Sequence, residues 1–67
     1  MKDIEIRNKR NLTKRLIKAI IEGNNVIFRG KYIINHIGLT TYIDFDFLKE
    51  LEFDEIKEIL MKCDIHV

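Results

Sequence analysis

Apolar residues recur at helical spacing near the start of the chain. Over residues 11–22, at about 100° per residue, four of them share one side of a helix: Leu12, Leu16, Ala19 and Ile20. Asn11 is placed as the N-cap, and Gly23, followed by two asparagines, is placed to end the helix. The spacing therefore predicts a first helix over residues 11–22 with one face in the core.

The opposite side of this helix carries lysines. Lys14 and Lys18 lie one turn apart, and Ile17 and Ile21 flank them instead of joining the apolar stripe. Either the two isoleucines meet a second layer, or they stay exposed beside the lysines as a contact surface. We favour the first interpretation, a wide buried face, because the domain is small.

Residues 26–46 are rich in β-branched and aromatic side chains and are punctuated by glycines, which predicts strands. A two-residue turn at Gly30-Lys31, with glycine first as a type II′ turn requires, pairs Arg29 with Tyr32 and Ile27 with Ile34. Three apolar residues then share one face of the sheet: Val26, Phe28 and Ile33.

A second turn near residues 37–39 leads into a third strand. Alternation puts Thr41, Ile43 and Phe45 on one face of this strand. The other face carries polar groups, at Tyr42, Asp44 and Asp46. We therefore expect a three-stranded antiparallel meander with one face packed on helices.

A second helical pattern follows in residues 47–63. Six residues fall within about half of the helix circumference: Leu48, Leu51, Ile56, Ile59, Leu60 and Cys63. Either one helix spans the stretch, or a short helix precedes a longer one that starts at Glu55 with Asp54 as its N-cap.

The two ends of the chain carry shorter patterns. Residues 3–7 alternate and predict a short strand or an extended arm with Ile4 and Ile6 on one face. The tail 64–67 either pairs as a short edge strand through Ile65 and Val67 or frays.

These patterns predict an α+β fold in the order (β)-α-β-β-β-α: a single small domain over residues 1–67, with a three-stranded antiparallel meander packed with two helices. Its 67 residues allow one domain, and a chain of this size buries only about 60% of the surface that its unfolded form exposes. A homodimer would add stability.

Charge is sorted along the chain, although the formal net charge is only +1. Residues 1–31 hold nine Lys or Arg and three acids, whereas residues 32–67 hold three Lys and eight acids. The two halves therefore differ in sign, at +6 and −5. Such an asymmetry suits recognition of a charged partner or of a second copy. In a compact fold, the two regions either adjoin and neutralise each other or face apart as two surfaces.

Groups suited to catalysis or metal binding are few. Cys63, His66 and a distant His36 are three conceivable zinc ligands, but structural zinc sites normally have four. Asp44 and Asp46 could pair on one strand face, a pattern that any half-exposed strand also gives. We therefore expect no catalytic residue, no metal and no cofactor, and a chain that is not an enzyme.

The first functional hypothesis is a small protein-binding module. Its acidic strip docks on the basic surface of a larger protein, with two phenylalanines as anchors. The proposed contact residues are Asp44, Asp46, Glu50, Glu52, Asp54, Glu55, Glu58, Phe47 and Phe53. Such a strip could imitate nucleic acid. By analogy of size and charge, a phage-encoded inhibitor of a host nucleic-acid enzyme, such as an anti-CRISPR protein, fits this description. The thirteen isoleucines and the excess of Lys over Arg agree with AT-rich codons.

The second hypothesis is a small DNA- or RNA-binding protein that uses the basic segment 7–18. Six cations would contact phosphates and two outward tyrosines would stack on bases: Arg7, Lys9, Arg10, Lys14, Arg15, Lys18, Tyr32 and Tyr42. If the helix extended back to Asn8, Arg10 would join Lys14 and Lys18 on one ridge. A third alternative is self-association of basic and acidic halves.

The sequence also bears on location. No apolar run is long enough for a membrane span, and a lone cysteine fits a reducing compartment. We therefore expect a cytoplasmic protein, in the host cytoplasm if it is phage-encoded, without a membrane partner.

Overall fold

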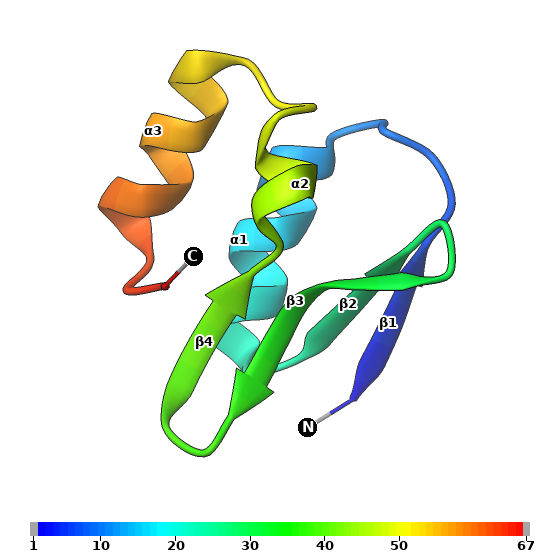
Figure 1. Cartoon of the computed structure of the whole chain (residues 1–67), viewed down its shortest axis with the longest axis vertical. Coiled ribbons are helices and arrows are strands. Elements are labelled where there is room, and N and C mark those ends of the chain that lie inside the picture. Colours follow the sequence, from blue (N-terminus) through cyan, green and yellow to red (C-terminus); the bar gives the residue numbers. More distant parts are fainter. Residues whose placement is uncertain (1, 67) are drawn as a thin grey trace.

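The computed structural model describes residues 2–66, and Figure 1 shows its elements. Within this range, four strands and three helices follow one another: β1 (Asp3–Ile6), α1 (Leu12–Glu22), β2 (Asn25–Phe28), β3 (Lys31–Ile37), β4 (Thr40–Ile43), α2 (Phe45–Leu48) and α3 (Phe53–Lys62). The strands form one sheet in the order β1-β2-β3-β4. In Figure 1, β1 forms one edge of the sheet, and α3 lies on the side of β4.

The sheet is mixed and four-stranded, which corrects the expected three-stranded meander. Strands β2, β3 and β4 do pair antiparallel, but β1 joins β2 in parallel through the crossover helix α1. The alternating residues 3–7 therefore contain a paired strand, β1, and do not form an extended arm. Ile4 pairs with Val26 and Ile6 with Phe28, so both isoleucines point to the core face.

The β2–β3 turn is centred on Arg29-Gly30, one residue earlier than the predicted Gly30-Lys31. Both residues have positive φ, 53° at Arg29 and 76° at Gly30, as a type I′ turn requires. Phe28 therefore pairs with Lys31, and Ile27 pairs with Tyr32 instead of Ile34. The predicted turn was wrong because it assumed that a non-glycine residue avoids the left-handed backbone conformation. Arg29 adopts this conformation here.

A β-bulge in β3 completes this hairpin. The register shifts between Val26 and Ile27, which pair with Ile34 and Tyr32, so Ile33 is the extra residue. Ile33 and Ile34 are both buried as a result. The bulge thus explains how two consecutive residues of one strand reach the core, and it keeps Val26, Phe28 and Ile33 buried together as predicted.

Helix α1 confirms the predicted span. Gly23 ends it with φ 75°, and the amides after Glu22 bond back to the carbonyls of Ala19 and Ile20. Asn11 occupies the N-cap position but makes no side-chain cap bond. Ile17 is buried, whereas Ile21 is 71% exposed, so the buried face widens by one isoleucine only.

Because α1 begins at Leu12, it does not reach back to Asn8. Arg10 therefore belongs to the loop before the helix, and the predicted ridge of Arg10, Lys14 and Lys18 on one continuous helix does not form.

The third meander strand ends at Ile43, three residues before the expected end. The Asp44 side chain accepts a hydrogen bond of 3.0 Å from the Phe47 amide and so caps α2. Asp44, Phe45 and Asp46 are thus a helix start and not a strand, which separates Phe45 from the buried strand face. Phe45 is exposed beside the Lys49 ammonium.

The last helical stretch forms two helices, α2 and α3, which is one of the two predicted arrangements. Glu52, and not Asp54, is the N-cap of α3. Its side chain and that of Glu55 form a reciprocal capping box, which fixes the start of the helix. Beyond α3, His66 bridges Tyr42 in parallel and so covers the outer edge of β4. Val67 lies outside the described residues.

One hydrophobic cluster fills the space between the sheet and the helices. Helix α1 packs on β2 and on α3, and the most deeply buried side chains come from every layer: Ile6, Leu16, Val26, Ile34 and Ile59. Burial of these aliphatic groups is the main stabilising contribution to a domain of this size.

The bulged register makes a prediction for two isoleucines on the same strand. Ile34 is fully buried opposite Ile43, whereas Ile37 is 60% exposed opposite Thr40. We expect Ile34→Val to lower the free energy of unfolding by about 1 kcal/mol. The matched Ile37→Val should change it by less than about 0.5 kcal/mol. Urea unfolding followed by circular dichroism measures both, and equal losses would contradict the register.

Candidate functional site

Lys31 joins the basic half of the chain to the acidic half. Its ammonium lies 3.2 Å from a carboxylate oxygen of Asp44 and 3.9 Å from one of Asp46. Lys31 stands at the start of β3, and the two acids stand at the start of α2, so the hairpin register brings them together. Asp46 also lies 3.8 Å from Lys49, one turn along the chain.

Glu50 forms a second junction of the two halves. Its Oε1 lies 3.3 Å from the Lys9 ammonium and accepts a hydrogen bond of 3.1 Å from Arg29 Nη1. The Arg29 guanidinium lies over the Phe28 ring at 4.8 Å, and that ring packs edge-on against Phe47 at 5.6 Å. The left-handed backbone at Arg29 thus places its side chain between an aromatic ring and a carboxylate.

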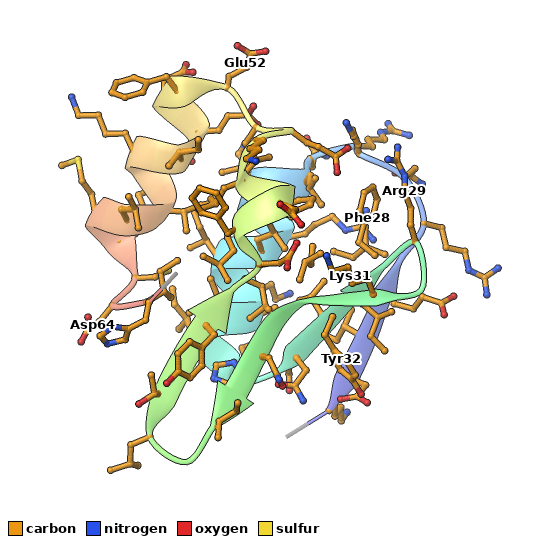
Figure 2. The ribbon with its side chains drawn as sticks, in the orientation of Figure 1. Phe28, Arg29, Lys31, Tyr32, Glu52 and Asp64 are labelled. Atoms are coloured by element: carbon orange, nitrogen blue, oxygen red, sulfur yellow. The ribbon has the colours of Figure 1, made fainter. Side chains whose placement is uncertain are left out.

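These contacts answer the question of whether the two charged regions adjoin. Figure 2 shows Phe28, Arg29 and Lys31 together around the turn, with Glu52 apart at the start of α3. Apart from the half-buried Asp44 the paired groups are exposed, so each pair contributes little to stability. Together they neutralise three acids of the expected strip: Asp44, Asp46 and Glu50. Phe47 is 2% exposed, so it belongs to the core and not to a contact surface.

Glu55 is held between α1 and α3. The Thr13 hydroxyl donates a hydrogen bond of 2.7 Å to its Oε2, and the Glu52 amide donates one of 3.0 Å to its Oε1. These two donors, the Thr13 hydroxyl first, lower the pKa of the Glu55 carboxyl. Glu55 therefore serves helix packing and capping, and both of its oxygens already have partners.

What remains of the acidic strip lies on α3. Glu52 and Asp54 are exposed at its first turn, and Glu58 lies 3.7 Å from Lys62 one turn later. Phe53, between the two acids, is 80% exposed. Leu60 and Met61 are exposed at 47% and 77% on the same helix.

The α3 surface, defined as Glu52, Phe53, Asp54, Leu60 and Met61, was only partly foreseen from the sequence. The helical pattern placed Leu60 in the buried stripe and did not mark Met61. Leu60 lies at the edge of the stripe, about 80° from its centre between Ile59 and Cys63, and this is the signal that could have identified it as exposed.

The basic residues divide into paired and unpaired groups. Arg7 donates a hydrogen bond of 2.7 Å to Glu5, and Lys9 pairs with Glu50. Of the six cations in segment 7–18, the other four form no ion pair with a carboxylate of residues 2–66: Arg10, Lys14, Arg15 and Lys18. Arg15 instead donates a hydrogen bond of 3.3 Å to the Arg10 carbonyl.

The two tyrosines lie on the sheet face opposite to α1. Tyr32 pairs with Ile27 and Tyr42 with Asn35, positions that alternate with the buried Val26 and Ile34. The sheet therefore separates them from the cations of α1, and the structure does not bring these two parts of the expected nucleic-acid surface together.

Tyr32 is also engaged in a local network. Its hydroxyl donates a hydrogen bond of 2.6 Å to Asp3, whose other oxygen accepts one of 3.0 Å from Asn25. These donors lower the pKa of the Asp3 carboxyl, and the bond to Asp3 raises the pKa of the Tyr32 hydroxyl. Tyr42 lies beside the His66 ring at 6.1 Å between centroids.

The groups considered for metal binding or nucleophilic chemistry lie in structural roles. His36 is bonded through Nε2 to the Asn24 carbonyl and through Nδ1 to the Thr41 hydroxyl. Cys63 is buried, and burial raises the pKa of its thiol. Among residues 2–66, no three His, Cys, Asp or Glu side chains come together in an arrangement that could hold a metal ion.

Comparisons with protein-family models, with curated proteins and with solved structures find no match to this chain. Over the described part of the chain, none of the helices has both the length and the apolar character needed to cross a membrane.

The Glu55 contacts make a prediction about pH. Because the folded pKa of Glu55 is lowered, its contribution to stability is complete above the ordinary value of 4.5 and is lost as the pH falls through the folded pKa. We expect Thr13→Val to return the Glu55 pKa toward 4.5. The difference in stability between this variant and the wild type should shrink on acidification.

A carbon-detected NMR titration of the Glu55 carboxyl measures this pKa directly. Thr13→Ser is the control, because it keeps the hydroxyl donor and should keep the lowered pKa. An unchanged Glu55 pKa in Thr13→Val would contradict the assigned hydrogen bond.

Proposed function

We propose that the chain is a small, non-enzymatic protein-binding module whose docking surface is the α3 surface. The observation that carries this proposal is the exposure of Phe53, which at 80% is the largest among the four phenylalanines of the chain. Burial of a solvent-exposed phenylalanine side chain in a partner's pocket removes a large apolar area from water, so such a residue contributes strongly to binding.

The geometry of α3 supports this role. The capping box fixes the helix start, so Phe53 is presented from a rigid turn and loses little conformational freedom on docking. Leu60 and Met61 extend the apolar surface along the same helix. The charged side chains of Lys57 and Glu58 lie beside Met61 on this helix. Exposed apolar groups surrounded by polar ones are typical of interaction sites on small soluble proteins.

The charges beside Phe53 select the class of partner. Glu52 and Asp54 flank it, and neither forms an ion pair within the described residues. An apolar pocket with Lys or Arg at its rim complements this arrangement. The partner proposed from the sequence, a larger protein with a basic surface such as a nucleic-acid enzyme, has this chemistry, and a phage-encoded inhibitor is one setting in which the module would act.

The test starts with the partner itself, captured from cells of the source or its host, identified by mass spectrometry and then purified. Against that partner, we expect Phe53→Ala to raise the Kd by about tenfold or more. Glu52→Lys together with Asp54→Lys should also weaken binding, most strongly at low salt. Calorimetric titration measures each change.

Two controls match these variants. Leu39→Ala removes an apolar group that is even more exposed than Phe53, from the β3–β4 turn. Asp64→Lys reverses a charge that lies at the opposite end of α3 from Glu52 (Figure 2). Both should leave the Kd within about twofold, as expected for residues outside an interface. Unchanged binding of the Phe53 and Glu52/Asp54 variants would refute docking through α3.

A second candidate function, nucleic-acid binding, is favoured by one observation: the four unpaired cations Arg10, Lys14, Arg15 and Lys18 lie on α1 and the loop before it. Glu22 is the acid on this helix. If phosphates bind here, Lys14→Glu with Lys18→Glu should abolish binding and flatten its salt dependence. Fluorescence polarisation with single- and double-stranded DNA at about 50 mM salt tests this, and no binding by the wild type would exclude it.

A further inference from the structure

The two edges of the sheet differ. The outer edge of β4 is covered, because the His66 amide donates to the Thr41 carbonyl and the Ile43 amide donates to the His66 carbonyl, at 2.8 and 2.9 Å. The outer edge of β1 has no strand beside it within residues 2–66 (Figure 1). An open edge leaves main-chain donors and acceptors free to pair with another strand.

The free groups of β1 follow from its register. The Lys2 carbonyl accepts a hydrogen bond of 2.8 Å from the Asn25 amide, so the main chain of Lys2 faces β2. Because main-chain direction alternates along a strand, Ile4 and Ile6 also face β2, whereas the amides and carbonyls of Asp3 and Glu5 face outward.

A hollow lies on the core side of this edge. Its volume is about 230 Å³, and Ile4, Ile6 and Ala19 form its apolar part. Arg15, Lys18 and Glu22 of α1 surround it, so the rim has an excess of positive charge. Ile4 is only partly buried although it points to the core face, because nothing in the described chain covers the hollow from outside.

The side chains on the opposite face of β1 already have partners in the chain. Asp3 accepts hydrogen bonds from Tyr32 and Asn25, and Glu5 pairs with Arg7. A strand added beside β1 therefore meets an excess of negative charge on this face, from Asp3, Glu5 and Arg7. On the core face it meets an excess of positive charge, from Arg15, Lys18 and Glu22. The local charges thus differ on the two sides of one edge.

We propose that the open edge of β1 binds an extended segment of a partner protein by strand addition, independently of the α3 surface. Main-chain hydrogen bonds to Asp3 and Glu5 supply affinity, and the hollow supplies selectivity. The segment carries an aliphatic residue flanked by acids on the face toward Arg15 and Lys18. Hydroxyl or basic residues lie on its other face, beside Asp3 and Glu5.

The probe is a capped peptide, Lys-Glu-Thr-Leu-Thr-Glu-Lys, whose symmetric pattern suits either strand direction. At saturation, amide hydrogen exchange at Asp3 and Glu5 should slow by about tenfold or more, because both amides gain an acceptor. The Leu39 amide, in the β3–β4 turn, should not change. The charge-swapped peptide, Glu-Lys-Thr-Leu-Thr-Lys-Glu, should bind at least about fivefold more weakly.

Variants of the chain separate this edge from other surfaces. Arg15→Glu should weaken binding of the first peptide by about fivefold, whereas Lys14→Glu, on the same helix but outside the hollow, should not. Phe53→Ala should leave peptide binding unchanged. A failure of the strand-addition proposal can therefore be distinguished from a failure of the proposed docking through the α3 surface.

Three results would overturn the proposal. The first is peptide binding without slower exchange at Asp3 and Glu5. The second is no binding of either peptide at millimolar concentration. The third is a dimer in light scattering whose Asp3 and Glu5 amides are already protected without peptide, since the edge would then belong to a second copy of the chain.

Discussion

The left-handed turn at Arg29-Gly30 is the constraint on which the rest of this structure depends. It sets the pairing of Phe28 with Lys31, and the bulge that follows sends both Ile33 and Ile34 into the core. A non-glycine residue in this region of backbone space costs free energy. The Phe28 ring and the Glu50 carboxylate both contact the Arg29 side chain in this conformation.

The same turn decides how the charge asymmetry of the sequence is used. By placing Arg29 on Glu50 and Lys31 on Asp44 and Asp46, it pairs the first three acids of the acidic strip with cations of the chain itself. At the start of α3, Glu52 and Asp54 form no ion pair within residues 2–66 and flank the exposed Phe53. The asymmetry therefore serves folding at one end of the acidic strip and, as we propose, recognition at the other.

The sequence predicted those helices and strands that are determined by residues close to one another in the chain. The apolar stripe of α1 and the glycine that ends it suffice to place that helix, and alternation places the antiparallel strands. Pairing of β1 with β2 could not be predicted, because four alternating residues do not say which strand they join. The end of β4 was misplaced because Asp44 suits a strand by alternation and a helix N-cap by its side chain, and the capping bond prevails.

For the candidate site, the sequence identified Phe53 and the acids beside it, but it could not tell Phe47 from Phe53. Both follow an acid and precede helical residues, and only the packing of Phe47 on Phe28 separates them. The partners of Glu50 and Glu55 lie 21 or more residues away in the chain, at Arg29, Lys9 and Thr13, and no periodicity marks contacts of that range.

A nuclear Overhauser spectrum of the hairpin tests the central claim most directly, because the charge pairs depend on the strand register. We expect cross-strand contacts between the backbone protons of Phe28 and Lys31, and contacts between the Phe28 and Phe47 rings. Cross-strand contacts between Arg29 and Tyr32 would contradict it, since that register turns Lys31 away from Asp44 and releases Arg29 from Glu50.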